Sequence, residues 1–232
     1  EDDSAKDDQG EVYHPGGGGG GGGSAADDDD DDNVGSCGLV YAVGQGILQK
    51  GEGMWSDVTP ASLFQSGWML SDVDLVNCSE GFAVGVDRTG HTGIVLREKE
   101  NGWAQVQIDY PGEDWELFSV SMGSDDFGFA VGANWKQGAG VILAYNGETW
   151  NAATAPMISE DWWLTDVQIT GEGTAVAVGF DWQNQAPVIL AYDAGTWTRV
   201  AFAGATGGFG FYALQMDDQE NGFAVGVDLD NR

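Results

Sequence analysis

The sequence predicts an all-β fold: a β-propeller of four-stranded antiparallel blades with a 47-residue repeat, in an incomplete ring. Three sets of anchor residues recur with that spacing, and apolar residues alternate with polar ones between them. The anchors are an Ala-Val-Gly tripeptide, an aromatic residue ahead of it and a Trp behind it. They stand at Ala83, Ala130, Ala177 and Ala224; at Trp68, Trp115, Trp162 and Phe209; and at Trp103, Trp150 and Trp197. A parallel β-helix or two packed sheets are the alternatives.

Each repeat contains four short strands. In the first strand, apolar Val73 and Leu75 alternate with Asp72 and Asp74, which is the period of a β-strand. The second strand, 82–85, has no polar face, which is typical of a strand buried on both sides. An apolar run at 94–96 gives the third strand, and the fourth begins at the Trp anchor. No helical pattern interrupts the repeats.

The chain divides into a tether and a repeat region. Residues 1–33 combine acidic runs with a run of glycines, so they cannot bury enough apolar surface to fold, and we expect a disordered tether. The predicted propeller occupies 34–232: a partial blade 34–61, full blades 62–108, 109–155 and 156–202, and a partial blade 203–232. An open ring exposes blade edges, so we expect a piece of a longer protein. Alternatively, the first strand of the last repeat completes the first blade.

The composition excludes several function classes. The chain has 38 Asp and Glu against 8 Lys and Arg, a net charge of −30, which repels nucleic acid. No apolar run is long enough for a transmembrane segment. Two His and two Cys cannot build a zinc cluster. We expect no cofactor and no metal, apart from loose Ca²⁺ binding at the Asp run 27–32.

Catalytic patterns are missing as well. The four Arg do not fall at equivalent positions, as an arginine cluster for sialidase chemistry would need. His91 is the one His in the repeat region and has no accompanying nucleophile motif. We therefore expect no catalytic residue and no enzyme activity.

Two segments carry a resemblance to known proteins. Residues 140–150 read Gly-Val-Ile-Leu-Ala-Tyr-Asn-Gly-Glu-Thr-Trp, and 187–197 read Pro-Val-Ile-Leu-Ala-Tyr-Asp-Ala-Gly-Thr-Trp. With the preceding Gly-Phe-Ala-Val-Gly, the phrase resembles repeats of bacterial cell-surface propellers. It is more distantly similar to photosystem II assembly-factor propellers and to the Asp-box (BNR-like) repeats of sialidases. The resemblance implies an extracytoplasmic bacterial protein (cell-surface, periplasmic or secreted), with a lipid anchor upstream of Glu1 as a further expectation.

The predicted ligand surface is one rim of the propeller. Up-and-down strand order places the loops between second and third strands beside the loops that join blades. We expect eight-residue loops at Val86–Gly93, Ala133–Gly140 and Phe180–Pro187. Aromatic and carboxylate side chains there suit a sugar or a peptide. The predicted ligand-binding residues are Trp135, Trp182, Asp87, Arg88, Asp181, Tyr110, Asp114 and Asp161. Alternatively, the two Trp plug the loops while Asp87, Asp181 and Asp228 cap turns.

The two cysteines occupy equivalent positions. Cys37 and Cys78 each lie five residues before an Ala-Val-Gly tripeptide, so a disulfide between them is one expectation and two buried free thiols the other. Taken together, the sequence predicts a non-catalytic scaffold that binds a protein or a glycan. The alternatives are a glycan-processing propeller enzyme and an assembly chaperone.

Overall fold

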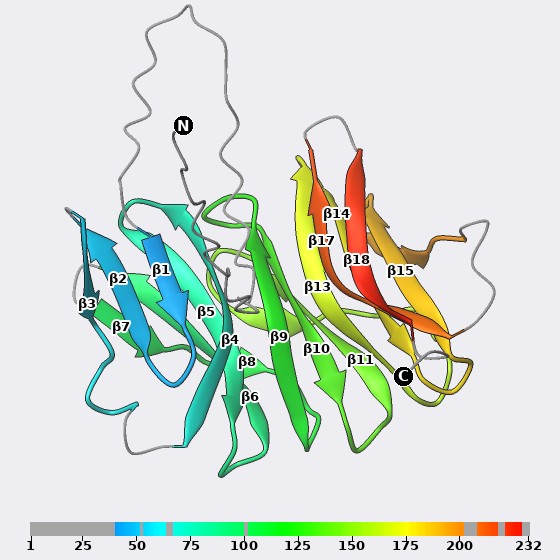
Figure 1. Cartoon of the computed structure of the whole chain (residues 1–232), viewed down its shortest axis with the longest axis horizontal. Coiled ribbons are helices and arrows are strands. Elements are labelled where there is room, and N and C mark those ends of the chain that lie inside the picture. Colours follow the sequence, from blue (N-terminus) through cyan, green and yellow to red (C-terminus); the bar gives the residue numbers. More distant parts are fainter. Residues whose placement is uncertain are drawn as a thin grey trace, which may run out of the picture.

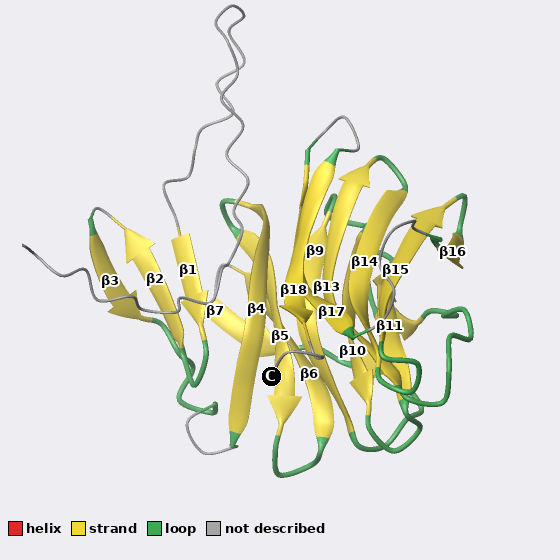
Figure 2. Ribbon diagram, turned by 45° about the vertical axis from the view of Figure 1, so that its right-hand side comes forward, coloured by secondary structure: helices red, strands yellow, loops and turns green. Residues whose placement is uncertain are grey.

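The computed structural model describes residues 40–51, 53–63, 67–99, 102–201, 208–217 and 221–228. Every regular element in these ranges is a β-strand, as Figure 2 shows. The all-β prediction is confirmed. The predicted tether and Cys37 lie outside the described residues.

The strands form five sheets that follow one another along the chain. The first sheet contains β1 (Val40–Val43), β2 (Ile47–Gly51) and β3 (Met54–Asp57). The second contains β4 (Trp68–Asn77), β5 (Glu80–Asp87), β6 (Thr92–Lys99) and β7 (Gly102–Gln105). The third contains β8 (Ile108–Asp109), β9 (Trp115–Met122), β10 (Gly128–Asn134), β11 (Ala139–Tyr145) and β12 (Trp150–Ala152). The fourth contains β13 (Trp162–Gly171), β14 (Thr174–Asp181), β15 (Ala186–Asp193) and β16 (Thr196–Arg199), and the fifth contains β17 (Phe209–Met216) and β18 (Gly222–Asp228).

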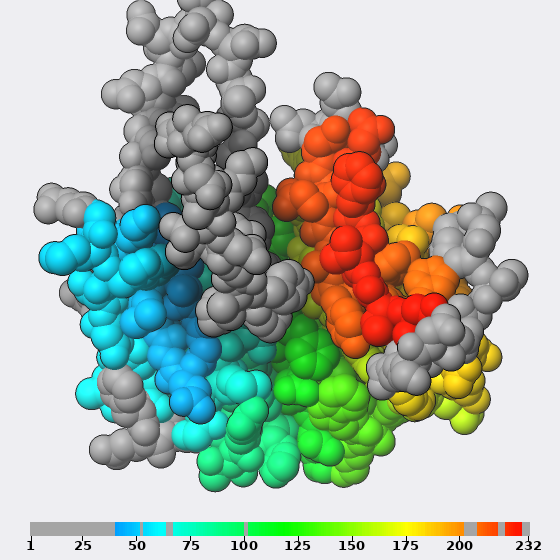
Figure 3. Space-filling view, viewed as in Figure 1, coloured from blue at the N-terminus to red at the C-terminus, as the bar shows by residue number. Residues whose placement is uncertain are grey.

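These sheets are the blades of an unclosed β-propeller. Apart from the short β8, consecutive strands within a sheet pair antiparallel, and the sheets stand side by side in chain order (Figure 1). The first strands β4, β9, β13 and β17 are neighbours in space, each beside the next. Between the described residues of the first and last sheets no strand pairing occurs, and Figure 3 shows their blue and orange-red atoms on opposite sides.

One sheet departs from the predicted four strands. The short β8 pairs in parallel with β12, so that Ile108 lies beside Trp150 and Asp109 beside Asn151. The segment that leads from the second sheet to the third thus adds a fifth strand at the outer edge. This pairing covers the outer edge of β12, which a four-stranded blade would leave open.

Aromatic side chains join neighbouring blades. The ring of Phe82 on β5 packs against Tyr145 and Trp150 of the next sheet, with centroids 4.9 and 5.4 Å away. Phe129, 47 positions later, packs in the same way against Tyr192 and Trp197, at 4.6 and 4.9 Å. Because Phe82 and Phe129 are buried, each contact removes a large apolar ring from water. The same contact between neighbouring blades therefore recurs every 47 residues.

The Ala-Val-Gly glycine is required by a β-bulge. In β9, Ser119 pairs with Val131 and Leu117 with Gly132, so Phe118 is the extra residue. The same shift occurs at the equivalent positions in the other first strands, where Ser71, Thr165 and Tyr212 are the extra residues. A Cβ at Gly132 would lie 1.9 Å from the backbone oxygen of Glu116, so only glycine allows this approach.

A second link between blades runs through polar side chains of the first strands. The carboxylate of Asp72 accepts a hydrogen bond from Val120 N at 2.9 Å, and that of Asp74 accepts one from Met122 N at 2.7 Å. The next pair of blades repeats the arrangement, and so does the one after it. There the acceptors are Ser119, Ser121, Asp166 and Gln168, and the donors are Val167 N, Ile169 N, Leu214 N and Met216 N. Each side chain thus satisfies a backbone N–H of the next first strand, which lies too far away for direct backbone pairing.

Candidate functional site

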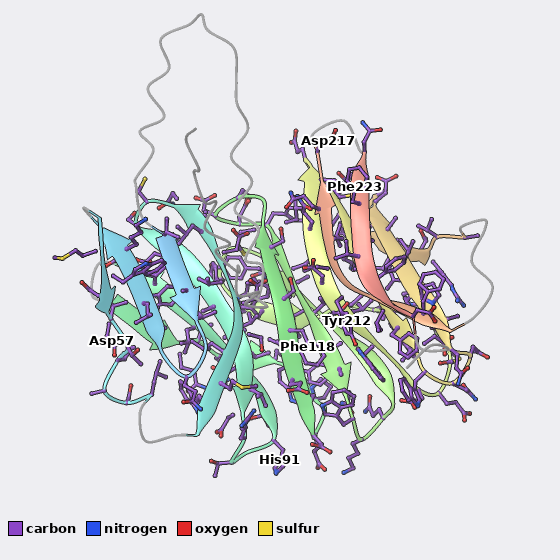
Figure 4. The ribbon with its side chains drawn as sticks, viewed as in Figure 1. Asp57, His91, Phe118, Tyr212, Asp217 and Phe223 are labelled. Atoms are coloured by element: carbon purple, nitrogen blue, oxygen red, sulfur yellow. The ribbon has the colours of Figure 1, made fainter. Side chains whose placement is uncertain are left out.

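The turns between second and third strands form a rim with the starts of the first strands. The backbone N–H of Trp115 donates to His91 O at 3.1 Å, and that of Trp162 donates to Gly138 O at 3.1 Å. Figure 4 shows His91 at this end of the molecule, and Asp217 and Phe223 at the opposite end. The rim is therefore held by hydrogen bonds from blade to blade.

The rim turns are shorter than predicted. Residues Asp87, Asn134 and Asp181 still belong to strands, which leaves only four residues in each turn: 88–91, 135–138 and 182–185. Side-chain oxygens of these strand ends accept hydrogen bonds from Thr89 N at 2.8 Å, Gln137 N at 2.8 Å and Asn184 N at 3.0 Å. The expected eight-residue loops are wrong because these caps let the ladder continue almost to the tip.

Asp181 does not belong to the ligand surface. It is 0% exposed, and its carboxylate accepts hydrogen bonds from the Ser159 hydroxyl and the Asn184 amide, both at 2.8 Å. The prediction that Asp181 contacts a ligand is corrected, since its carboxylate is buried and is hydrogen-bonded to Ser159 and to the turn residue Asn184. Asp87, which is half-buried, has the same capping role in its own blade.

The two predicted tryptophans are exposed on the rim. Trp135 and Trp182 each expose 46% of their surface. The indole N–H of Trp135 donates to Glu116 Oε1 at 2.8 Å, while Trp182 stacks on Trp163 with centroids 6.1 Å apart and planes 22° apart. The Trp side chains are fixed by neighbours but remain accessible.

Trp135 and Trp182 belong to a larger aromatic strip that crosses three sheets. Trp163 lies between them, 5.4 Å from the Trp135 ring, and Phe118 and Phe180 extend the contacts at 6.2 and 5.2 Å. Tyr212 of β17 follows beyond Trp182, across a small hollow. We use the name aromatic strip for Phe118, Trp135, Trp163, Phe180, Trp182 and Tyr212. Figure 4 shows Phe118 and Tyr212 nearer the His91 end than the Asp217 end.

Sequence reasoning did not place Phe118, Phe180 and Tyr212 in the site. Phe118 and Tyr212 are both the extra residues of β-bulges, and they lie two repeats apart in the sequence. A bulge turns its extra side chain away from the regular alternation. The available signal was an aromatic residue three positions after the Trp115 and Phe209 anchors.

Two other predicted residues are engaged in local contacts. The guanidinium of Arg88 reaches Met69 Sδ at 3.0 Å. The hydroxyl of Tyr110 accepts a hydrogen bond from the Asn134 amide at 3.0 Å, and its ring packs against Trp115 at 4.5 Å. Arg88 and Tyr110 thus lie on the rim but outside the aromatic strip.

Asp114 and Asp161 support the tryptophans through their backbone. Their carbonyl oxygens accept the backbone N–H of Trp135 and Trp182, each at 2.8 Å. Asp114 adopts a left-handed backbone (φ 55°), and its carboxylate lies 3.6 Å from His91 Nδ1. The structure brings these residues beside the strip.

Charge on the rim is mostly negative. Lys136 pairs with Glu113, and this hydrogen bond and charge lower the pKa of the Glu113 carboxyl and raise that of the Lys136 ammonium. Among the described residues, no group of three or more His, Cys, Asp or Glu is arranged to hold a metal ion. The same part of the chain contains no helix that could cross a membrane.

Cys78 lies in the turn between β4 and β5 and is exposed, so the expectation of a buried thiol is wrong for this residue, because a two-residue turn leaves its side chain in solvent. Its predicted partner, Cys37, lies outside the described residues, so the disulfide stays a prediction.

Solved structures match the fold of this chain. YCF48 from Cyanidioschyzon merolae aligns with a TM-score of 0.57 at 13% identity, covering 82% of this chain and 64% of that one. This likeness shows the fold. The chain is a β-propeller. Weaker matches are YCF48 bound to D1 peptide (TM-score 0.44, 17% identity, 58% of this chain and 41% of that one) and a fucose-specific lectin from Aleuria aurantia (0.49, 14%, 73% and 58%).

The chain spans 41% to 64% of the length of these propellers. No family model matches the sequence, and no curated protein matches it. The expected distant likeness to known propellers is confirmed for the fold, whereas membership of a bacterial cell-surface repeat family stays a prediction.

Proposed function

We propose that this β-propeller is a non-catalytic binding scaffold, located outside the cytoplasm, whose ligand-binding surface is the aromatic strip. The observation that carries the proposal is the exposure of Trp135 and Trp182 on either side of Trp163. Large aromatic rings gathered on a surface favour association, since binding removes their apolar area from water. The ligand is a protein or a glycan.

Hydrogen bonding within the rim supports binding over catalysis. The Glu116 carboxylate accepts the Trp135 indole N–H, Glu113 pairs with Lys136, and Asp181 is buried in its turn. A glycosidase needs one carboxyl free to act as acid and a second as base or nucleophile. These three carboxylates each have a structural role, which leaves them poorly suited to such chemistry.

The test compares variants of exposed tryptophans. The chain is screened on a glycan array and against a peptide library, and hits are titrated with Trp135→Ala, Trp182→Ala and Trp55→Ala. Trp55 is a matched control because it is similarly exposed but lies on β3 of the first sheet. We expect loss of binding in the two strip variants and unchanged binding in Trp55→Ala. Equal binding by all variants contradicts the proposed surface, and hydrolysis of arrayed glycans contradicts the non-catalytic assignment.

Location is tested separately. The complete natural gene product that contains this sequence is fused to a reporter that is active only after export and is expressed in a bacterium. Export supports an extracytoplasmic scaffold, and retention in the cytoplasm contradicts it.

A further inference from the structure

A hollow of about 100 Å³ interrupts the aromatic strip between the fourth and fifth sheets. Trp163, Phe180 and Trp182 line it from the fourth sheet, and Phe211, Tyr212 and Val227 line it from the fifth. Its volume suits one side chain rather than a chain of sugars.

The hollow arises from two local features of β17. The residue 47 positions after Trp163 is Gly210, whose missing side chain lets Phe180 pack against the backbone: a Cβ there would lie 2.4 Å from Phe180 Cδ2. The bulge at Tyr212 then places an exposed ring at the opening. Beside Trp135 the equivalent positions are occupied by Trp163 and Thr165 in place of Gly210 and Tyr212, so the fifth sheet alone combines the glycine with an aromatic bulge residue.

The walls offer little hydrogen bonding. The Thr165 hydroxyl donates within the protein, with Phe211 O at 2.8 Å and Val178 O at 3.2 Å as its acceptors. Apart from the Tyr212 hydroxyl and the indole N–H groups of Trp163 and Trp182, the other lining side chains are hydrocarbon. A sugar ring has more hydroxyls than these groups can bond, and burying the rest without partners costs free energy, whereas an aliphatic or aromatic side chain has no such cost.

The surroundings are acidic. Glu160 and Asp161 directly precede β13 at this end of the fourth sheet, and Asp228 ends β18 opposite Phe209; Glu160 and Asp228 are exposed. Such a field attracts cations, and indole rings at the opening also favour Lys and Arg through cation–π contacts.

Resting on the proposed function, we infer that this hollow takes an apolar side chain of a protein partner, from a segment in which basic residues flank that side chain. The apolar group fills the space between Trp163 and Tyr212 while the flanking cations lie over Trp182 and toward Glu160. Hydrophobic burial supplies affinity, and the charges supply orientation and rate.

The experiment titrates the full chain with short synthetic peptides that carry one central Leu, Pro or Phe between runs of Lys. Matched peptides replace the central residue with Ser, or every Lys with Glu. We expect the Lys-flanked apolar peptides to bind, the Ser and Glu peptides to bind about tenfold more weakly or worse, and binding to weaken with NaCl.

Two variants locate the binding. Val227→Phe fills the hollow and Tyr212→Ala opens it, and near-ultraviolet circular dichroism checks that each remains folded. Loss of peptide binding in both, with unchanged binding in Trp55→Ala, supports the inference. Peptide affinity that is unchanged in both variants overturns the inference.

Other outcomes separate this inference from the proposed function. Binding of an arrayed glycan that Trp182→Ala abolishes, without peptide binding, overturns the peptide inference and leaves the scaffold function standing. If neither peptides nor glycans bind through the strip, both are overturned.

Discussion

The carboxylate of Asp72 accepts a hydrogen bond from the backbone N–H of Val120, a residue 48 positions later on the first strand of the next blade. Its other oxygen accepts the N–H of Val73 in its own strand at 2.8 Å. One side chain thus replaces the ladder that two neighbouring first strands cannot form directly. The equivalent bond, which the backbone N–H of Leu214 donates to the Asp166 carboxylate, makes this a repeating link between blades.

The Asp72 link predicts that stability falls as pH rises from 4 to 6. Burial raises the pKa of the Asp72 carboxyl from 3.8 to about 6, outweighing its hydrogen bonds, and burial also raises the pKa values of Asp74 and Asp166. Between those values the folded state holds protons that the unfolded state has lost, so the free energy of unfolding decreases with pH. For Asp72 alone the change is on the order of 3 kcal/mol, complete above its folded pKa. Urea unfolding across this range measures it.

Two aspartate variants make the pH test specific. Asp72→Asn should flatten the slope, because an amide has no proton to lose. Asp57→Asn should leave it intact, since Asp57 is exposed and its pKa is lowered by hydrogen bonds with Thr59. A slope unchanged in Asp72→Asn would show that this carboxyl is not its source.

Phe129 and Phe223 occupy equivalent positions, yet we predict very different costs of truncation. Phe129 is 1% exposed under the rings of the next blade, and Phe223 is 83% exposed on β18. Phe129→Ala should cost about 3–5 kcal/mol of unfolding free energy, and Phe223→Ala less than about 0.5 kcal/mol. Chemical denaturation of the two variants provides the comparison. Similar losses would mean that Phe223 is covered in solution.

The bulge glycines predict a second asymmetry. A Cβ at Gly132 would lie 1.9 Å from Glu116 O, whereas nothing lies within 4 Å of a Cβ at Gly44, the glycine of a further Ala-Val-Gly tripeptide that begins at Ala42. We expect Gly132→Ala to lower the unfolding free energy by about 2 kcal/mol or more, because backbone must move. Gly44→Ala should change it by no more than about 0.5 kcal/mol. Equal midpoints for the two variants in thermal melts would contradict the requirement for a glycine at the bulge.

The fold was predictable because every blade repeats the same interface. Phe82 and Phe129 each contact the Trp that follows after 68 residues, namely Trp150 and Trp197. The 47-residue period therefore reflects a contact that recurs in each pair of blades. The alternation of Asp72 and Asp74 with apolar residues predicted a strand. It did not predict that their carboxylates accept hydrogen bonds from the next blade. Nothing in one strand's pattern reveals the partner of a half-buried carboxylate.

The candidate site was only partly predictable. Trp135 and Trp182 stood out as aromatic residues in expected turns, and the structure places both on the rim. Asp181 belonged to the same stretch of sequence, yet the short turn buries it. Tyr212 was missed because a bulge reverses the side on which its ring falls, and bulges depend on pairing between strands rather than on local pattern.

The net charge of −30 predicts that salt stabilises the folded chain. Folding brings like charges closer together than they lie in the unfolded chain, so their repulsion lowers stability when it is unscreened. Most of the gain should appear as ionic strength rises from about 0.01 to 0.15 M, where the Debye length falls from roughly 30 to 8 Å. Melting temperatures in NaCl, with an uncharged osmolyte of equal osmolality as control, measure the effect. A melting temperature that stays level or falls with NaCl would show that the carboxylates are too far apart, or too well solvated, to repel.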